Sequence, residues 1–598
     1  MSAPREPVPD AAVSYRVTVS DPNTHLFQVQ VTIAHPQADQ VVSLPVWIPG
    51  SYLVREFSSN LQGLKASQSS RALALQQLDK CSWRVAAQPE QPLQLSYEVY
   101  ALDNSVRTAW LDASRAFFNA TSLCLRVHGQ EQSLHELELV PHPCMSQWSV
   151  ATGLSPHRVT RRGFGLYRAH DYGELLDCPV EMGDFWSGSF EACGIPHRFV
   201  VAGAAPGFDG ERLLADTRRI CETAIRFWHP ASAPRAHRKP PHASYLFLLN
   251  ASHDGYGGLE HRNSTALLCA RKDLPQLGAE PGATPEGYAT LLGLISHEYF
   301  HTWNVKRLRP AEFAQYDYAQ ENYTELLWFF EGFTSYYDDL LLCRAGLLDA
   351  AQYLKRLDKT VNQVMQTPGR AVQSVAQASF DAWVKLYRQN ENTANATVSY
   401  YSKGSLVALC LDLSLRAGGR TTLDEVMRSL WQRCQGGPMT QGDLEAVLLQ
   451  CAGRSYAREI ARWVHGTTEL PLPELLAHGG LAAVTEPAPL AQRLGLRVND
   501  SHGLKIKTVL RGGVAEQAGF TAGDEWLGVE VGGARQASAW RMSRLDDLLL
   551  YAGAHKRVSA LVARDQRLLR LDLKLPRPAT VLRLSTQDQA LLDRWLLG

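Results

Sequence analysis

The chain has 598 residues, of which 45% are hydrophobic and 20% charged, the composition of an ordinary globular protein. It is too long for a single hydrophobic core, so we expect three or four domains. Lys and Arg together number 60, as do Asp and Glu, so the net charge is zero. This balance argues against a nucleic-acid partner or a membrane-surface partner, because both select basic surfaces.

Targeting signals and cysteine usage indicate a cellular compartment. The sequence has no run of about 18 apolar residues, and residues 1–13 lack the apolar stretch of a signal peptide. The 11 cysteines are scattered singly, without a CxxC pair. An odd number of isolated cysteines favours free thiols in a reducing compartment over a disulfide framework. We therefore expect a cytoplasmic protein, or a periplasmic one if a leader has been removed.

The first part of the chain has a strand pattern. Residues 13–168 consist of short alternating segments, such as HLFQVQVTIA and LQLSYEVYAL, separated by Pro, Gly and Asn. This spacing predicts an all-β domain, built as a sandwich or a curved sheet. From about residue 180, segments typical of strands, such as HRFVVAG, alternate with helical segments such as ERLLADTRRICETAIRFWH. The chain as a whole is therefore expected to be a multidomain α+β protein.

Two longer helices follow. The first is predicted to begin near the capping hydroxyl of Thr284, with Pro285 in its first turn, and to run through LLGLISHEYFHTW. The second is predicted to run through ENYTELLWFFEGFTSYYDDLLLCRAG and to stop at Gly346, because glycine is typical just after a helix. We then expect further helices to about residue 466, a connector in PLPELLAHGG, short strands from Leu494 to Leu575, and a terminal helix in STQDQALLDRWLL.

The motif HEYFH at residues 297–301 is the strongest chemical signal. Positions i and i+4 share one face of a helix, so His297 and His301 can bind the same ion while Glu298 stands beside its open position. The rest of this helix is apolar, so a buried cluster of two histidines and a glutamate needs a compensating partner, which Zn²⁺ can be. The alternative is a chance match that binds no metal. We predict one zinc ion here.

A catalytic zinc site usually has a third protein ligand, and three glutamates compete for that role. Glu321 lies 20 positions after His301, near the separation common in zinc peptidases, whereas Glu331 lies 30 positions after it. Glu331 is nevertheless favoured, because an unpaired carboxylate within LLWFFEGF is costly to bury. Glu321 and Glu325 fall in the polar first turns of the predicted helix, where negative charge suits the dipole. We predict Glu331 as the ligand; a solvated helix face is the alternative.

Three motifs carry a family resemblance. Residues 328–337, WFFEGFTSYY, resemble the second zinc motif of the aminopeptidase N and leukotriene hydrolase group, in which Glu-Gly-Phe follows an HExxH helix. Residues 257–261, GGLEH, are similar to its exopeptidase motif, and residues 401–404, YSKG, to its tyrosine motif. Leu259 and His261 depart from the Gly-x-Met-Glu-Asn form of the exopeptidase motif, and the spacing of the zinc motif is longer.

These departures, together with WIPGSY at residues 47–52 and a PDZ-like C-terminal region, resemble the glycyl aminopeptidase family of zinc metallopeptidases. The resemblance implies a thermolysin-like zinc peptidase domain behind a β domain, and removal of small N-terminal residues, glycine first and alanine next. We predict an N-terminal all-β domain, a thermolysin-like catalytic domain, its helical extension, a PDZ-like domain and a C-terminal helix, at residues 1–175, 176–345, 346–470, 485–580 and 581–598.

The motifs and the resemblance also imply a role for each site residue. Glu298 is the expected general base. Tyr401 is expected to donate a hydrogen bond to the oxyanion, and is preferred to the neighbouring Tyr400 because it begins the YSKG match; the alternative is that either tyrosine is plain core packing. Glu260 is expected to bind the free α-amine, unless it is an exposed loop acid. The substrate is expected to lie along the strand residues Gly257, Gly258 and Leu259.

Residues 504–527 resemble a bacterial PDZ domain, with Leu494-Gly495-Leu496 as a candidate carboxylate loop. This domain is expected to bind peptide C-termini or a partner protein, or to pack on the catalytic unit and bind nothing. Two other functions remain open: a zinc endopeptidase, in which Glu260 is no amine anchor, and a non-enzymatic protein that captures peptide ends. The intact Glu298 argues against the latter, because a structural zinc site needs no base.

Overall fold

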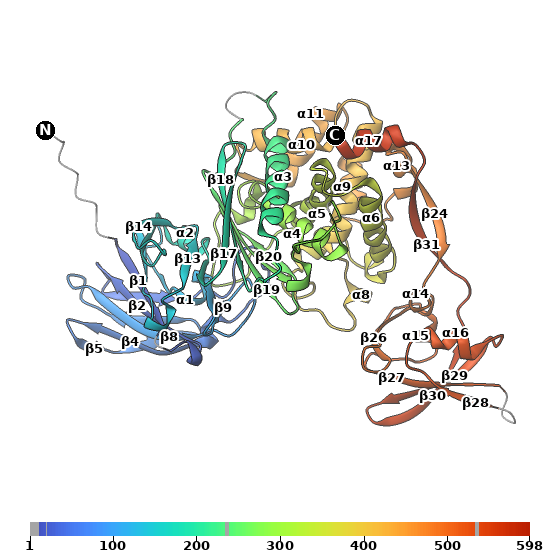
Figure 1. Cartoon of the computed structure of the whole chain (residues 1–598), viewed down its shortest axis with the longest axis horizontal. Helices are drawn as coiled ribbons and strands as arrows, with labels where there is room; N and C mark the ends of the chain where they lie inside the picture. Colours follow the sequence, from blue (N-terminus) through green and yellow to red (C-terminus); the bar gives the residue numbers. More distant parts are fainter. Residues whose placement is uncertain (1–10, 20, 234–237, 281, 533–536) are drawn as a thin grey trace. The chain divides into compact units, whose positions relative to one another are not determined.

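The computed structural model describes residues 11–19, 21–233, 238–280, 282–532 and 537–598 (Figure 1). The chain divides into two compact units. The first comprises residues 1–322, 345–348 and 431–439, and the second comprises residues 323–344, 349–430 and 440–598. The domain boundaries expected from the sequence stay predictions.

The first unit begins with three β-sheets, so the expected β-rich N-terminal region is confirmed. One sheet has eight strands in the order β14 (Ser155–Val159), β15 (Gly165–Ala169), β12 (His135–Leu139), β1 (Val13–Val19), β2 (Leu26–Ile33), β8 (Leu93–Tyr100), β4 (Leu61–Gln68) and β5 (Arg71–Leu73). Alternate residues of the central strands are buried, as the alternating sequence requires of a sheet with one covered face.

Two four-stranded sheets complete this region. The first has the order β13 (Ser149–Thr152), β16 (Val180–Gly183), β10 (Arg115–Phe118) and β9 (Ala109–Leu111). The second has the order β11 (Arg126–Val127), β3 (Asp39–Ser43), β7 (Ser82–Ala86) and β6 (Leu75–Gln77). The loop that follows β3 contains WIPGSY.

A five-stranded sheet follows in the same unit. Its order is β17 (Trp186–Ala192), β18 (Ile195–Ala202), β19 (Tyr245–Ser252), β21 (Ser264–Ala270) and β20 (Gly257–Glu260). The three central strands are parallel, and β20 pairs antiparallel with β21 at the end of the sheet. Buried side chains of this sheet, including Leu248, Leu259 and Ala266, belong to the same hydrophobic core as the N-terminal strands. The N-terminal region therefore shares a hydrophobic core with the sheet that carries β20.

Helices α3 (Gly210–Trp228) and α4 (Glu286–Phe300) pack against this sheet, α3 on β17 and α4 on β20 and β21. The predicted α4 is confirmed, but its cap is not. Pro285 occupies the N-cap position, and no side chain caps the helix there, because Thr284 lies one residue outside it. The helix ends at Phe300, and His301 is its C-cap residue.

Two helices form the centre of the second unit. They are α5 (Leu327–Arg344) and α9 (Tyr400–Ala417), and they pack against each other and against α6 (Ala350–Met365), as Figure 1 shows. Glycines lie at the crossing of α5 and α9: a Cβ added to Gly332 would lie 2.6 Å from the backbone of Gly404. The absence of side chains at this point brings the two helices close together.

The start of α5 was predicted too early. Glu321 and Glu325 precede the helix rather than occupying its first turns. The backbone N–H of Trp328 donates to the Ser379 hydroxyl (2.9 Å), which belongs to α7 (Val375–Phe380). This tertiary contact satisfies an N–H group at the helix start, which a local sequence pattern cannot reveal. Gly346 follows the helix in the left-handed conformation (φ +66°), in agreement with the prediction.

The rest of the second unit contains a helix that we expected to be a connector, α13 (Leu472–His478), which packs on α9. A six-stranded sheet with its own core follows. It consists of β25 (Leu496–Asn499), β26 (Lys505–Val509), β27 (Glu525–Val531), β29 (Arg557–Arg564), β30 (Arg567–Lys574) and β28 (Ser538–Arg541).

The strands on either side of this sheet in the sequence pair with each other. They are β24 (Leu481–Pro487) and β31 (Thr580–Thr586), which form an antiparallel ladder. The predicted terminal helix is α17 (Gln589–Leu597). It packs on α5, where the Trp595 indole N–H donates to the Tyr336 hydroxyl (3.0 Å).

The ten cysteines whose side chains are described are free thiols, and seven of them are buried. Across the described ranges, no helix combines the length and apolar character that a membrane span needs.

Candidate metal centre and active site

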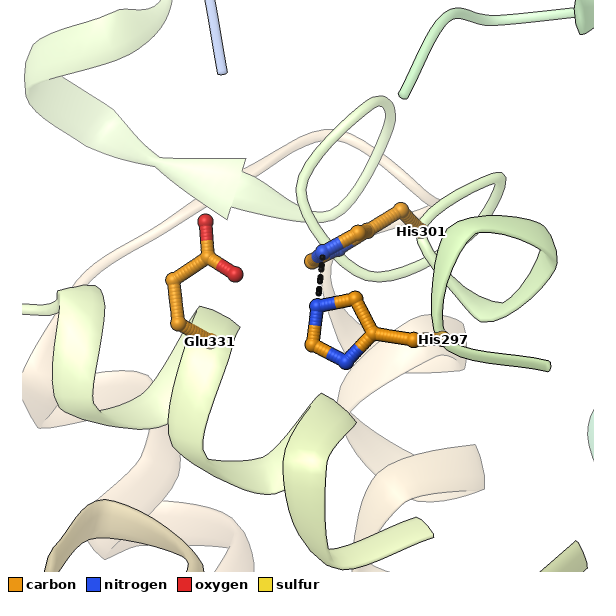
Figure 2. Close-up of side chains that lie close together, drawn as sticks. All are labelled: His297, His301 and Glu331. Carbon is orange, nitrogen blue, oxygen red and sulfur yellow. Dashed lines mark hydrogen bonds between the residues drawn. The ribbon is translucent and has the colours of Figure 1, made fainter. Parts of the chain in front are cut away.

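The two histidines of HEYFH lie at the end of α4. His301 is 1% exposed, and its Nδ1 lies 2.7 Å from the backbone oxygen of Asn304. Because a carbonyl oxygen only accepts, this Nδ1 carries the proton, and Nε2 presents a lone pair. That Nε2 lies 3.1 Å from Nε2 of His297. Both histidines therefore turn the same ring nitrogen toward one point (Figure 2).

Glu331 completes a group of three potential ligands. It belongs to the second turn of α5 and is 2% exposed. One ligand atom from each of His297, His301 and Glu331 lies within 4.8 Å of the others. Figure 2 shows the carboxylate turned toward the two rings. Two imidazole nitrogens and one carboxylate oxygen form the donor set of a catalytic zinc site, so these residues fit the metal predicted from the sequence.

Two further histidines form hydrogen bonds with a tyrosine of this helix. The hydroxyl of Tyr299, at the centre of HEYFH, lies 2.9 Å from His197 Nε2 and 3.1 Å from His242 Nε2. Burial lowers the pKa of His197 to about 4, and burial together with the positive charge of Arg307 lowers that of His242 to about 3. Both rings are therefore neutral at pH 7. Sequence reasoning missed them, because neither has a motif spacing to Tyr299.

Glu298 faces strand β20. It is 5% exposed, and a Cβ added to Gly258 would overlap its carboxylate. The strand therefore passes directly over the Glu298 carboxylate, and glycine at position 258 permits this approach. Arg107, from the N-terminal region, donates from Nη2 to the Gly258 carbonyl oxygen (3.1 Å). The backbone of β20 is thus held beside Glu298.

Glu260 is the last residue of β20 and is 5% exposed, so it is not an exposed loop acid. Its surroundings include a buried ion pair, in which Lys306 Nζ lies 2.8 Å from Asp177 Oδ1. Burial lowers the pKa of Lys306, but the negative charges of Asp177 and Glu260 outweigh it and raise the pKa overall. Lys306 therefore stays charged near Glu260.

His261, which stands where the related motif has asparagine, turns toward Asp177. Its Nδ1 lies 3.2 Å from Asp177 Oδ1, and the ring is buried. The histidine that replaces asparagine at this position therefore contacts Asp177, just after the end of β20. Asp177 and Lys306 were not singled out in the sequence, because Asp177 lies far from the motifs along the chain and Lys306, although only five positions after His301, belongs to none of them.

Tyr401 is the second residue of α9 and is partly exposed, whereas Tyr400 is fully buried. The Tyr401 hydroxyl lies 3.2 Å from that of Tyr387. Burial raises the pKa of Tyr401, and the negative charge of Glu331 raises it further. The hydroxyl therefore keeps its proton at neutral pH and can donate a hydrogen bond.

Comparisons with known proteins connect this arrangement to peptidases. Residues 14–184 match the family model of the peptidase M61 N-terminal domain, and residues 290–407 match that of M61 glycyl aminopeptidase. The second range contains HEYFH, Glu331 and Tyr401. No curated protein matches the chain.

Solved structures are also similar. An aminopeptidase N family protein from Idiomarina loihiensis is 36% identical, with a TM-score of 0.91, over 98% of this chain and 100% of that one. An M1 zinc metallopeptidase from Deinococcus radiodurans is 16% identical, with a TM-score of 0.47, over 78% of this chain and 95% of that one. A form of the Deinococcus radiodurans enzyme bound to a Tyr-Ser-Ala substrate is 15% identical, with a TM-score of 0.48, over 78% and 96%.

Proposed function

Because this chain belongs to the M61 glycyl aminopeptidase family, we propose that it is a zinc aminopeptidase that removes small residues, glycine first and alanine next, from the free N-terminus of peptides. The cluster of His297, His301 and Glu331 is the observation that carries the proposal. Its three ligands belong to the type of site that binds one zinc ion and keeps a position for water.

The proposed reaction needs an activated water molecule and a general base. When bound, zinc acidifies a water molecule and polarises the scissile carbonyl. Glu298 is the general base: its carboxylate takes a proton from the water and passes it to the leaving amine. Its burial against β20 supports this role, because the contact with Gly258 holds the carboxylate in one place.

Tyr401 donates a hydrogen bond to the oxyanion that forms on the substrate carbonyl. Burial raises the pKa of both Tyr400 and Tyr401, so both hydroxyls keep their protons at neutral pH. The exposure of the two rings supports Tyr401, because it is partly exposed whereas Tyr400 is fully buried.

The free amine of the substrate is bound by Glu260. The substrate lies along β20, against the backbone of Gly257, Gly258 and Leu259. A buried carboxylate at the end of this strand forms an ion pair with the ammonium group of a substrate and loses this ion pair when the N-terminus is blocked. Glu260 therefore makes the enzyme an exopeptidase.

The C-terminal sheet has a separate role in this proposal, which is to bind peptide C-termini or a partner protein as a PDZ-like domain. Strand β25 stands at the end of the sheet order, where an extended peptide can be added. Gly495, just before β25, is in the left-handed conformation (φ +73°), as a tight carboxylate loop requires. Peptides with a free C-terminus should bind more tightly than their C-terminal amides, and equal binding of both would exclude this role.

Hydrolysis of glycyl-, alanyl- and leucyl-anilides beside N-acetyl-glycyl-anilide tests the enzymatic proposal. Wild type should cleave the glycyl substrate fastest and leave the acetylated one intact. Glu298→Gln should retain zinc, measured by elemental analysis, and lose turnover. Cleavage of the acetylated substrate would instead indicate the endopeptidase alternative. Bound zinc without cleavage of any of these substrates would leave a peptide-binding protein.

A further inference from the structure

The WIPGSY loop, residues 47–52, is fixed to the region beside the catalytic sheet. The Trp47 indole N–H donates to the backbone oxygen of Asp317 (2.8 Å), and the indole is fully buried. The Tyr52 ring stacks on Phe313, with a distance of 5.9 Å between ring centroids. Both ends of the loop are therefore held, so the residues between them have a defined position.

Gly50, in the middle of this loop, lies against the Glu260 carboxylate. A Cβ added to Gly50 would lie 2.5 Å from Oε2 and 2.6 Å from Oε1 of Glu260, and real Cβ atoms do not approach other atoms closer than 3.0 Å. The backbone of Gly50 is also left-handed (φ +92°). Any larger residue here would both strain the loop and displace the carboxylate.

The backbone of β20 next to Glu260 is held by hydrogen bonds. The carbonyl oxygen of the preceding residue, Leu259, accepts from the Thr265 hydroxyl (3.0 Å), and that of Gly258 accepts from Arg107. These contacts fix the strand, so the position of the carboxylate depends on the side-chain torsions of Glu260. The bare α-carbon of Gly50 limits those torsions from the outside.

We propose that Gly50 is a positioning residue of the amine subsite: it sets the place at which the Glu260 carboxylate meets the primary ammonium group of the substrate. This assignment rests on the proposed aminopeptidase function. Selection of a free N-terminus is then shared between the catalytic strand and a loop of the N-terminal β region, 210 positions earlier in the chain.

Gly50→Ala tests the assignment, with Gly63→Ala as the matched control. Gly63 lies in the same β region and has the same left-handed backbone (φ +66°), but an added Cβ would meet nothing within 4 Å. With glycyl-anilide, Gly50→Ala should lose about 10- to 100-fold in kcat/KM, mainly through KM, as expected when a charged hydrogen bond is misplaced. Gly63→Ala should stay within about 3-fold of wild type, since it shares the strain alone.

A double-mutant cycle with Glu260→Asp separates positioning from loop damage. Aspartate is one methylene shorter, so its carboxylate withdraws from position 50 and leaves room for a methyl group. In the Glu260→Asp background, Gly50→Ala should therefore change kcat/KM by less than about 3-fold. Inhibition by glycinamide should weaken in Gly50→Ala in parallel with KM, whereas N-acetylglycinamide should inhibit neither enzyme.

Equal KM values for the two glycine variants, or a loss that persists undiminished in the Glu260→Asp background, would overturn the assignment. If Gly50→Ala does not fold, the double variant decides: a folded double variant supports the contact with Glu260, and an unfolded one contradicts it. Failure of the proposed function is distinguishable, because wild type itself would then cleave no free-amine substrate, and the Gly50 assignment would fall with it.

Discussion

At the scale of single residues, two adjacent tyrosines show how position decides chemistry. Tyr400 and Tyr401 follow each other at the start of α9, yet only Tyr401 keeps part of its surface accessible. Burial and the negative charge of Glu331 raise the pKa of both hydroxyls, so the difference between them is one of access and not of protonation. The two side chains are alike in size and chemistry, so each is a natural control for the other.

Tyr401→Phe is expected to lower kcat by roughly 10²–10³-fold with little change in KM, because it removes one oxyanion donor and no packing volume. Steady-state kinetics with glycyl-anilide measures this. Tyr400→Phe should retain kcat within a few-fold. A larger loss in Tyr400→Phe than in Tyr401→Phe would reverse the assignment.

The grouping of the candidate ligands was predictable from short spacing and from burial. The i, i+4 spacing predicted His297 and His301, and burial of a carboxylate among aromatic residues predicted Glu331, which the structure brings beside them. No such signal exists for His197 and His242. They lie 102 and 57 positions from Tyr299, and contacts over such separations in the sequence produce no recognisable local pattern.

The buried pair of histidines makes stability depend on pH. The pKa of His242 in the folded chain is about 3, below the value of about 6.5 expected in the unfolded chain. As the pH falls below about 6.5, the unfolded chain takes up a proton that the folded chain does not, so stability present above that pH is lost. Between pH 7.5 and 5.0 this amounts to about 2 kcal/mol for His242.

His242→Gln is expected to reduce that dependence, because the amide can still bond to Tyr299 but does not titrate. Thermal midpoints at pH 7.5 and 5.0, measured with a chelator present so that metal release plays no part, should differ less in the variant than in wild type. Equal shifts in both proteins would show that His242 does not contribute.

At the scale of secondary-structure elements, the crossing of α5 and α9 connects two sequence motifs. Gly332 follows Glu331, and Gly404 lies one turn after Tyr401, so the glycines that let the helices touch are neighbours of the side chains proposed to do chemistry. The close crossing thus influences the distance between Glu331 and Tyr401. Each glycine lies beside the residue to which we assign a role because the two helices can touch there only without side chains.

Gly332→Ala is expected to force the helices apart and to destabilise the protein by roughly 1–3 kcal/mol, as overpacking does. Calorimetry should show a lower thermal midpoint, and kcat should fall because Tyr401 moves away from Glu331. The matched control is Gly442→Ala in α11 (Gln441–Ala452), where the new methyl group meets only the Thr440 hydroxyl at 3.6 Å. That variant should be unchanged or slightly more stable.

Elements were predicted better than their ends. Apolar periodicity and length predicted α4 and α5, and both exist. The predicted start of α5 was wrong; the N–H of Trp328, at the observed start, is satisfied by the Ser379 hydroxyl, a partner 51 positions away. The helix α13 was missed for a related reason: proline and glycine at its ends indicated a loop, whereas packing on α9 stabilises the short helix between them.

At the scale of the whole molecule, a bound ion would add to stability, since it binds the folded chain and not the unfolded one. Removal of zinc with EDTA should lower the thermal midpoint by several degrees, corresponding to about 3–4 kcal/mol when zinc is present at 100 to 1,000 times its Kd. Added zinc should restore the midpoint. In Glu298→Gln, EDTA should lower the thermal midpoint as much as in wild type, because this variant keeps its metal ligands. In Glu331→Gln, EDTA should change the thermal midpoint little, because one of the proposed ligands is missing. An unchanged midpoint in wild type despite loss of the metal would contradict this coupling.

The ladder between β24 and β31 has a consequence for the history and the engineering of this chain. Pro487 is paired with Thr580, so the chain leaves and re-enters the helical region at one place. Asp358 and Asn362 of α6 accept from the backbone N–H groups of Leu584 and Leu582, which fastens the ladder from the helical side. The C-terminal sheet is therefore an insertion between the two paired strands β24 and β31. A tight turn in its place would leave α17 free to close against α5, so such a sheet can be inserted, exchanged or lost while the helical framework is retained.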